Sequence, residues 1–299
     1  MTEVADDGMP GAVAAFESAR PRLFGVAYRL LGTVDDAEDI VQDTWIRWQS
    51  ADRAAVRNAE AFLVTTASRL ALTAAGSARA RRELYVGPWL PEPVPTGEDT
   101  QVVVERGEAL ELAVLRLLER LTPQERAVYV LKEAFDYPYR EIAVLLGIAE
   151  SHARQLGHRA RGHVDRDRGS HVSPGERNRL LRAFLAAARG GDVEELRRML
   201  TANAVVHSDG GGVVTAARKP VRGRDRAARF LHRTIATHSR DARTTVVEAN
   251  GQEIVLVSLA REPIAACWVE ATSSGIDEVC LVVNPAKLAA LTTAAERRS

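Results

Sequence analysis

The side chains best suited to binding chemistry follow a short helical pattern and a turn. Residues 139–146 have helical periodicity, Gly147 marks a tight turn, and a second helical pattern follows at 150–164. This order is typical of a helix-turn-helix, whose second helix enters the major groove of DNA. With Ala153, Leu156 and Ala160 packed inward, the outward side chains can bond base edges and phosphates. They are Ser151, His152, Arg154, Gln155, His158, Arg159 and Arg161. An ordinary helical hairpin in a bundle is the alternative.

A second group of candidates is acidic and lies at 34–48, which read VDDAEDIVQDTWIRW. Such a segment favours a basic partner, although the helix dipole also stabilises acids in a first turn without any partner. Charge then changes sign: residues 1–43 carry nine acids against three cations, and 44–82 carry seven cations against two acids. Stretches 151–182 and 218–233 are also basic, at +5 and +6. The zero net charge is therefore a sum over opposed segments, and each basic one is either a nucleic-acid contact or a solvated helix face.

The elements that position these residues divide the chain into two halves. Helical periodicity covers the first 165 residues, with helices expected at 19–32, 34–49, 59–82, 102–120, 123–134, 139–146 and 150–164. Four prolines within residues 87–97 interrupt it and indicate a linker or an extended segment. After about residue 173, helices at 174–189 and 193–200 precede strand-like runs at 204–208, 243–249, 253–260, 265–270 and 276–283. The second half therefore reads as a separate α+β domain.

The composition of the chain limits the number of domains and excludes several classes of protein. The 299 residues favour two or three domains, and 46% hydrophobic with 27% charged residues excludes disorder as the main state. No apolar run approaches 18 residues and the start is acidic, so we expect neither a membrane span nor a signal peptide. Cys267 and Cys280 have neither a disulfide framework nor zinc-site spacing, so a reducing cytoplasm is the simplest location. Only three of the 40 basic residues are lysines, which fits either base composition or phosphate binding.

Together the motifs resemble a known family. Residues 34–48 resemble region 2.2 of extracytoplasmic-function (ECF) sigma factors of the sigma-70 family, 59–82 resemble regions 2.3 and 2.4, and 121–161 resemble region 4. The segments WLPEPV (89–94), DGGG (209–212) and NPAKL (284–288) resemble the class with a fused C-terminal SnoaL-like domain, the mycobacterial sigma factor J type. The resemblance implies two all-α domains, a region 2 bundle and a region 4 helix-turn-helix, followed by an α+β SnoaL-like (NTF2-like) cone-shaped barrel. Expected boundaries are 12–86 for region 2, 87–110 for the linker, 111–168 for region 4 and 174–290 for the SnoaL-like domain.

The resemblance also implies partners and site residues. A sigma factor binds core RNA polymerase, here through the β′ clamp helices and the β flap, and directs transcription initiation from specific promoters. The implied polymerase-binding residues are Asp36, Glu38, Asp39, Gln42 and Asp43. The implied minus-ten DNA residues are Arg57, Asn58, Phe62, Thr65 and Arg69, and the 150–161 helix would read the minus-thirty-five element. At 73–78 a run of small residues replaces the family's Asp-x-Leu-Arg, which removes long polar side chains from that helix.

For the C-terminal domain the resemblance implies regulation. The expected regulatory contacts join a linker segment to a glycine-rich turn: Trp89, Leu90, Pro91, Glu92 and Pro93 with Asp209, Gly210, Gly211 and Gly212. Val213 stands where that class usually has lysine, so a polar contact is expected to be missing or to come from Lys219. His207, Asp209 and Trp268 could face a pocket that holds a small ligand, although a lone strand histidine is more often structural.

Two readings from other classes stay open: a SnoaL-type enzyme with an appended DNA-binding module, and a ligand-responsive helix-turn-helix repressor. The acidic 36–48 helix discriminates against both, since neither needs a polymerase-docking surface. The preferred reading is a non-enzymatic sigma factor with no catalytic residues, no metal and no cofactor. In addition, residues 218–233 are expected to form a basic helix face, with Arg222, Arg224, Arg226, Arg229 and Arg233 outward, for non-specific DNA or polymerase contact. A purely structural helix face is slightly favoured over that contact.

Overall fold

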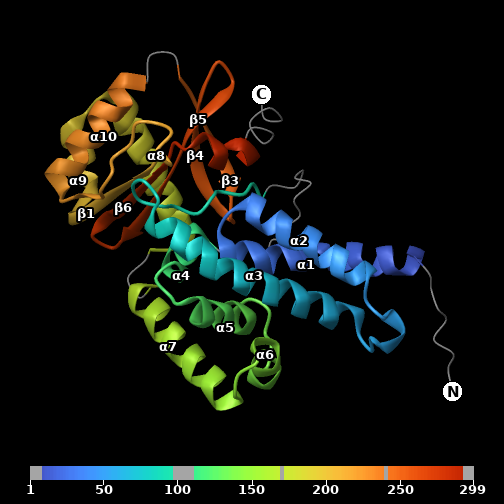
Figure 1. Ribbon diagram of the computed structural model, residues 1–299. Coiled ribbons are helices and arrows are strands. Elements are labelled where there is room, and N and C mark those ends of the chain that lie inside the picture. Colours follow the sequence, from blue (N-terminus) through green and yellow to red (C-terminus); the bar gives the residue numbers. More distant parts are fainter. Residues whose placement is uncertain (1–8, 97–110, 169–171, 239–241, 292–299) are drawn as a thin grey trace. The chain divides into compact units, whose positions relative to one another are not determined.

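The computed structural model describes residues 9–96, 111–168, 172–238 and 242–291 (Figure 1). The chain forms two compact units, and neither is continuous in sequence. The first contains residues 9–81 and 117–165 and is built of helices. The second contains residues 82–96, 111–116 and the described residues from 166 onward, and it carries the sheet. This arrangement confirms the expected class of helical regions followed by an α+β domain.

The first unit begins with helices α1 (Met9–Leu31) and α2 (Val34–Gln49), the 3-10 helix η1 (Arg53–Ala55) and helix α3 (Ala59–Glu83). The prediction of a first helix starting at residue 19 is wrong, because α1 starts at Met9 and runs through Pro21. Helix α2 supports the additional turns: Trp48 Nε1 donates to the Ala12 carbonyl at 3.0 Å, and the Phe16 and Trp45 rings lie 4.9 Å apart. Since proline weakens a helix interior, contacts distant in sequence stabilise this extension.

Four further helices follow along the chain: α4 (Leu112–Leu118), most of which belongs to the second unit, α5 (Pro123–Glu133), α6 (Tyr139–Leu146) and α7 (Glu150–Arg168). Of the helix predicted at 102–120, residues 102–110 lie outside the described residues. A capping box begins α5, in which the Thr122 hydroxyl accepts from the Glu125 N–H and the Glu125 carboxylate accepts from the Thr122 N–H. Gly147 has φ 66° and ends α6 in the left-handed conformation that glycine favours, so α7 starts directly after a tight turn.

The second unit combines helices α8 (Pro174–Gly190), α9 (Val193–Met199) and α10 (Arg224–His238) with a six-stranded sheet. Its strands are β1 (Leu200–Asp209), β2 (Val221–Arg222), β3 (Arg243–Ala249), β4 (Gln252–Leu259), β5 (Glu262–Thr272) and β6 (Gly275–Val282), and the 3-10 helix η2 (Pro285–Lys287) follows. The strand order is β2-β1-β6-β5-β4-β3, and only β1 and β6 pair in parallel. The sheet is open, with β2 and β3 as its edge strands, rather than closed into a barrel.

The two faces of this sheet differ in chemistry. Val206, Val279 and Val269 belong to the apolar core that the sheet forms with α8, α9 and α10, which lie together beside the sheet in Figure 1. Side chains of the opposite face form cross-strand rows, because directly paired residues point the same way. These rows place His207 beside Cys280 and Trp268, and Glu278 beside Glu270. We call this the polar face: His207, Asp209, Trp268, Glu270, Glu278 and Cys280.

The predicted helix over the basic run 218–233 is wrong at its start. Val221 and Arg222 pair with β1, and α10 begins at Arg224. Gly223, with φ 90°, makes the turn between them and donates its N–H to the Ala204 carbonyl at 2.9 Å. Within the described part of the chain, no helix has the length and apolar character needed to cross a membrane.

Candidate functional sites

The acidic candidates of α2 divide into two groups. Asp36 and Glu38 are partly buried and already have basic partners: Arg81 Nη2 lies 3.0 Å from Asp36 Oδ1, and Arg20 Nη2 lies 2.8 Å from Glu38 Oε2. The exposed members are Asp39, Gln42 and Asp43, which lie three and four residues apart and form one outward strip. Beside this strip lies an open hollow between α1 and α2. It is lined by Val13, Phe16, Glu17, Arg20, Glu38, Val41, Gln42 and Trp45.

The minus-ten candidates on and before α3 differ in how many contacts their side chains already make within the first unit. Asn58 accepts from the Ala61 N–H at 3.0 Å and so caps the start of α3, while Phe62 packs on Trp48 with ring centroids 5.5 Å apart. Arg57 is exposed and Thr65 is partly buried. Arg69 Nε donates to the Leu145 carbonyl at 2.8 Å, and its Nη2 donates to the Val144 carbonyl at 3.1 Å. These carbonyls end α6, so this arginine fills the place of a helix C-cap donor.

All seven minus-thirty-five candidates are exposed on α7. Three of the arginines form ion pairs within the first unit: Arg154 with Glu150 (2.5 Å), Arg159 with Glu125 (3.7 Å) and Arg161 with Glu133 (2.5 Å). Ala153, Leu156 and Ala160 are buried as predicted. The face therefore offers hydroxyl, imidazole, amide and guanidinium groups to solvent, as readers of a major groove do.

A glycine that sequence reasoning overlooked sets the approach of α6 to α7. A Cβ on Gly157 would lie 2.5 Å from the Tyr139 hydroxyl oxygen and 2.8 Å from its Cε1. Glycine therefore leaves room for the Tyr139 ring, which would have to shift to accommodate a side chain at residue 157. The nearby Arg154 guanidinium stacks over the same ring at 5.3 Å from its centroid.

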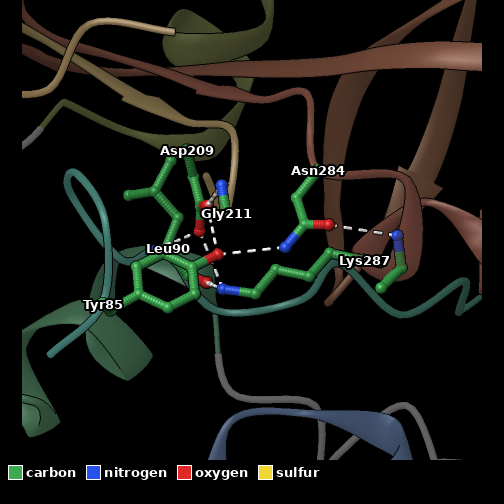
Figure 2. Close-up of polar contacts among 7 residues, drawn as sticks. Tyr85, Leu90, Asp209, Gly211, Asn284 and Lys287 are labelled. Carbon is green, nitrogen blue, oxygen red and sulfur yellow. Dashed lines mark hydrogen bonds and ion pairs between the residues drawn. The ribbon is translucent and has the colours of Figure 1, made fainter. Parts of the chain in front are cut away.

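In the second unit the buried Asp209 carboxylate holds the linker (Figure 2). Its Oδ1 accepts from the Tyr85 hydroxyl at 2.6 Å, and its Oδ2 accepts from the Leu90 N–H at 2.8 Å and from Lys287 Nζ at 2.7 Å. Lys287 also donates to the Leu90 carbonyl at 2.5 Å. We call this cluster the Asp209 clasp; its members are Tyr85, Leu90, Asp209, Gly211, Asn284 and Lys287. Burial lowers the pKa of Lys287, and Asp209 opposes that effect.

The glycine-rich turn belongs to the same clasp. Gly211 has φ 63°, and a Cβ there would collide with the Asn284 side chain, which donates to the Tyr85 oxygen at 3.0 Å. The expected polar contact from Lys219 is not what the structure has: Lys219 is exposed, and Lys287 makes the contact. Trp89 packs under two cations, since Arg82 lies 3.8 Å and Lys287 lies 4.1 Å from its ring centroid.

The linker has a second anchor at the β3–β4 turn. The Val94 N–H donates to Asn250 Oδ1 at 2.8 Å, and the Asn250 N–H donates back to the Val94 carbonyl at 2.9 Å. Thr96 also donates its N–H to the Glu248 carbonyl at 3.3 Å. Residues 90–96 are all buried. The proline segment is thus an extended, ordered part of the second unit.

A second interaction that sequence reasoning missed joins α4 to the polar face. Arg116 forms an ion pair with Glu278, donates to Cys280 Sγ at 3.2 Å, and lies 3.2 Å through Nη2 from His207 Nε2. His207 and Trp268, both expected near a pocket, do share this face, but Arg116 occupies the space beside His207. A sequence signal existed, because Arg116 is the only charged residue in the apolar run 112–118.

Two family models match the chain. Residues 15–81 match the family model "Sigma-70 region 2", and residues 111–164 match "Sigma-70, region 4". The chain is 40% identical over 224 residues to the ECF RNA polymerase sigma factor SigJ of Mycobacterium tuberculosis, covering 73% of this chain and 72% of that relative. It is 31% identical over 288 residues to a probable ECF RNA polymerase sigma factor, SigI, of the same organism, covering 92% and 94%.

A solved structure extends the likeness to three dimensions. The crystal structure of M. tuberculosis SigJ superimposes with a TM-score of 0.73 at 30% identity, covering 93% of this chain and 98% of that one. The expected family, its two sigma-70 regions and its non-enzymatic class are thereby confirmed. This chain belongs to the ECF RNA polymerase sigma factors, which act in promoter-specific transcription initiation.

Proposed function

We propose that this sigma factor recruits core RNA polymerase to a restricted set of promoters and that its C-terminal domain modulates this activity by holding the linker. The observation that carries the second part is the Asp209 clasp, which fixes Tyr85 and Leu90 just after the region 2 match ends at residue 81. The linker is the chain between the two DNA-binding regions. A domain that grips it therefore limits how those regions are spaced. This role would place the protein with core polymerase in the cytoplasm.

The polymerase-binding surface that we propose is the exposed strip of α2. Asp39, Gln42 and Asp43 present carboxylates and an amide, and the adjoining hollow offers Phe16 and Trp45 to an apolar side chain of the partner. Opposite charge steers encounter and fixes register more than it adds affinity. Asp36 and Glu38 would join the interface only by exchanging Arg81 and Arg20 for basic groups of the partner.

For promoter DNA we propose that α7 reads the minus-thirty-five element and that Arg57, Asn58, Phe62, Thr65 and Arg69 serve the minus-ten element. Arg69 can do so only after leaving the Val144 and Leu145 carbonyls. The described arrangement of the first unit would then precede promoter engagement. Single-stranded DNA offers phosphates and unstacked bases as the replacement partners.

In vitro transcription with purified core polymerase tests the main proposal. We expect promoter-dependent initiation by the full chain, and none by a variant with Asp39, Gln42 and Asp43 changed to lysine. Absence of initiation by the wild type on every member of a randomised promoter library would overturn it.

The modulation is tested by Asp209→Ala in the same assay. Loss of the clasp should change the initiation rate, whereas the matched variant Asp225→Ala, at an exposed acid of the same domain, should not. Equal rates for wild type and Asp209→Ala, with the linker shown to be released by its hydrogen exchange, would contradict the regulatory role.

A further inference from the structure

The side chains around Arg116 form a binding site for a single functional group, its guanidinium. Its guanidinium meets three different acceptors: the Glu278 carboxylate, the Cys280 sulfur and the His207 Nε2 atom. Arginine only donates hydrogen bonds, so the guanidinium is the donor in these contacts. A planar guanidinium can reach several acceptors in fixed directions at once, whereas an ammonium group is a compact point charge.

The surroundings are largely buried and carry a charge opposite to that of arginine. The Arg116 and Glu278 side chains are 13% and 23% exposed, and Cys280 is fully buried. Burial would raise the pKa of Glu278, but the His207 ring and the Arg116 guanidinium lower it to about 2, so the carboxylate is ionised. Glu270 adds a second acid to the same row of the sheet.

Trp268 lies on the same face beside the Arg116 site. Trp268 is fully buried in the row that contains Cys280 and His207, and its indole Nε1 has no hydrogen-bond partner among the described residues. Buried donors are normally satisfied. A guanidinium carries no acceptor, so this N–H makes no hydrogen bond to Arg116 or to an alkylguanidinium in its place.

The segment 111–116 contacts the rest of the second unit at both of its ends. Glu111, which precedes α4, accepts from Arg177 of α8 at 3.2 Å, and Arg116 occupies the polar face five residues later. The region 4 match begins at the same residue, 111. The occupant of this face is therefore the first helix of region 4.

We propose that the polar face is a guanidinium-binding site, that Arg116 is its occupant in the described conformation, and that a small alkylguanidinium compound takes the same place when Arg116 is withdrawn. Exchange of the occupant would release the first helix of region 4 from the C-terminal domain. This consequence rests on the proposed function, but occupancy of the site does not.

The test uses the chain's two cysteines as reporters. Cys280 contacts the guanidinium, whereas Cys267 lies in the apolar core on the other face of β5. In full-length Arg116→Ala we expect faster alkylation of Cys280 by iodoacetamide, mapped by peptide mass spectrometry, with Cys267 unchanged. Methylguanidinium should then protect Cys280, with labelling about tenfold slower once its concentration is roughly ten times its Kd.

Two controls make the outcome decisive. Methylammonium at equal concentration should give no protection, and Arg116→Ala/Glu278→Gln should lose the protection by methylguanidinium. Failure of methylguanidinium to protect Cys280, equal protection by methylammonium, or protection that persists without Glu278 would each overturn the proposal. Arg116→Met keeps the volume of the side-chain stem and allows the same measurement if the alanine variant does not fold. Because the readout is chemical labelling, its failure is distinguishable from a failure of promoter-dependent initiation.

Discussion

Two ion pairs of this sigma factor, one in each unit, differ sharply in their burial. In the first unit the Arg154–Glu150 pair is 62% and 40% exposed, as is typical of its ion pairs on α7. In the second unit the Lys287–Asp209 pair is 6% and 0% exposed. Exposed pairs contribute about 0.2–1 kcal/mol, whereas breaking one partner of a buried pair costs about 3–5 kcal/mol.

This difference separates two uses of charge. A side chain in an exposed pair can exchange its partner for a phosphate or for a polymerase residue at little cost. A side chain in a buried pair is committed to its own chain, and in this protein the Asp209–Lys287 pair fixes the linker at Leu90. The exposed pairs of α7 therefore fit the contacts with other molecules that we propose for it, and the Asp209–Lys287 pair fits the proposed positioning of the linker.

The largest expected effect comes from breaking the Asp209 clasp. Asp209→Ala leaves the Lys287 ammonium buried without a counter-charge and removes acceptors for Tyr85 and Leu90, so we expect a loss of about 3–5 kcal/mol in the second unit. Hydrogen exchange of peptides covering 85–96 and β1 measures it. Asp225→Ala is the matched control, since its exposed pair with Arg197 is worth about 1 kcal/mol or less. A loss for Asp209→Ala no larger than that of the control would contradict the comparison.

In the first unit, a substitution that disturbs packing rather than charge should cause the next largest loss of stability. Gly157→Ala places a methyl group against the Tyr139 ring, and overpacking of this kind costs about 1–3 kcal/mol. Gly162→Ala is the control on the same helix, because nothing lies within 4 Å of its Cβ position and alanine favours a helix by roughly 0.5–1 kcal/mol. Thermal unfolding should therefore shift in opposite directions for the two variants. Shifts of the same sign would show that α6 and α7 can separate freely.

The buried Glu270 carboxyl should make the stability of the second unit depend on pH. Burial raises its pKa to about 7 despite Arg177 and Arg116, with Glu111 and Glu278 as further charged neighbours. The folded state then binds a proton that the unfolded state has released, so stability falls as pH rises from about 4.5 to about 7, by up to about 1.4 kcal/mol per pH unit.

Glu270→Gln should remove this slope, as read from hydrogen exchange of β5 and β6 at the two ends of that range. The pKa of Glu278, lowered to about 2, has the opposite effect, so its contribution is lost as pH falls below about 4.5. A Glu270→Gln profile that keeps the wild-type slope would assign the pH dependence to another group.

The sequence predicts the elements whose signals are local. Helices α2 and α6 and strand β3 have the predicted bounds because hydrophobic periodicity, Gly147 and the flanking turns all lie within a few residues of them. The resemblance carried by the DGGG segment also implied a linker contact there, and Asp209 accepts from the Leu90 N–H. Local patterns carry this information because they reflect backbone geometry.

Other features depend on partners far along the chain. The turns of α1 before Pro21 rest on Trp48, and the role of Lys287 rests on Asp209, 78 residues away. The burial of Arg116 depends on strands more than 90 residues later, although a lone charge within an apolar helix was a visible signal. No periodicity rule links such positions, so their function emerges only from the folded chain.

The smallest change in stability is expected for Arg154→Ala. This variant should affect promoter binding without affecting folding. Arg154→Ala breaks an exposed i,i+4 pair with Glu150, which contributes about 0.3–0.5 kcal/mol, so the unfolding temperature should hardly move. If α7 reads the minus-thirty-five element, promoter affinity should fall by about 1–3 kcal/mol where Arg154 meets a base, or evenly across sequences where it meets a phosphate. Holoenzyme binding to promoter variants at two salt concentrations distinguishes these cases. Arg140→Ala, at an exposed arginine of α6, is the matched control. Unchanged affinity for both variants would mean that the exposed charges of α7 do not meet DNA, and the contrast between the units would then concern burial alone.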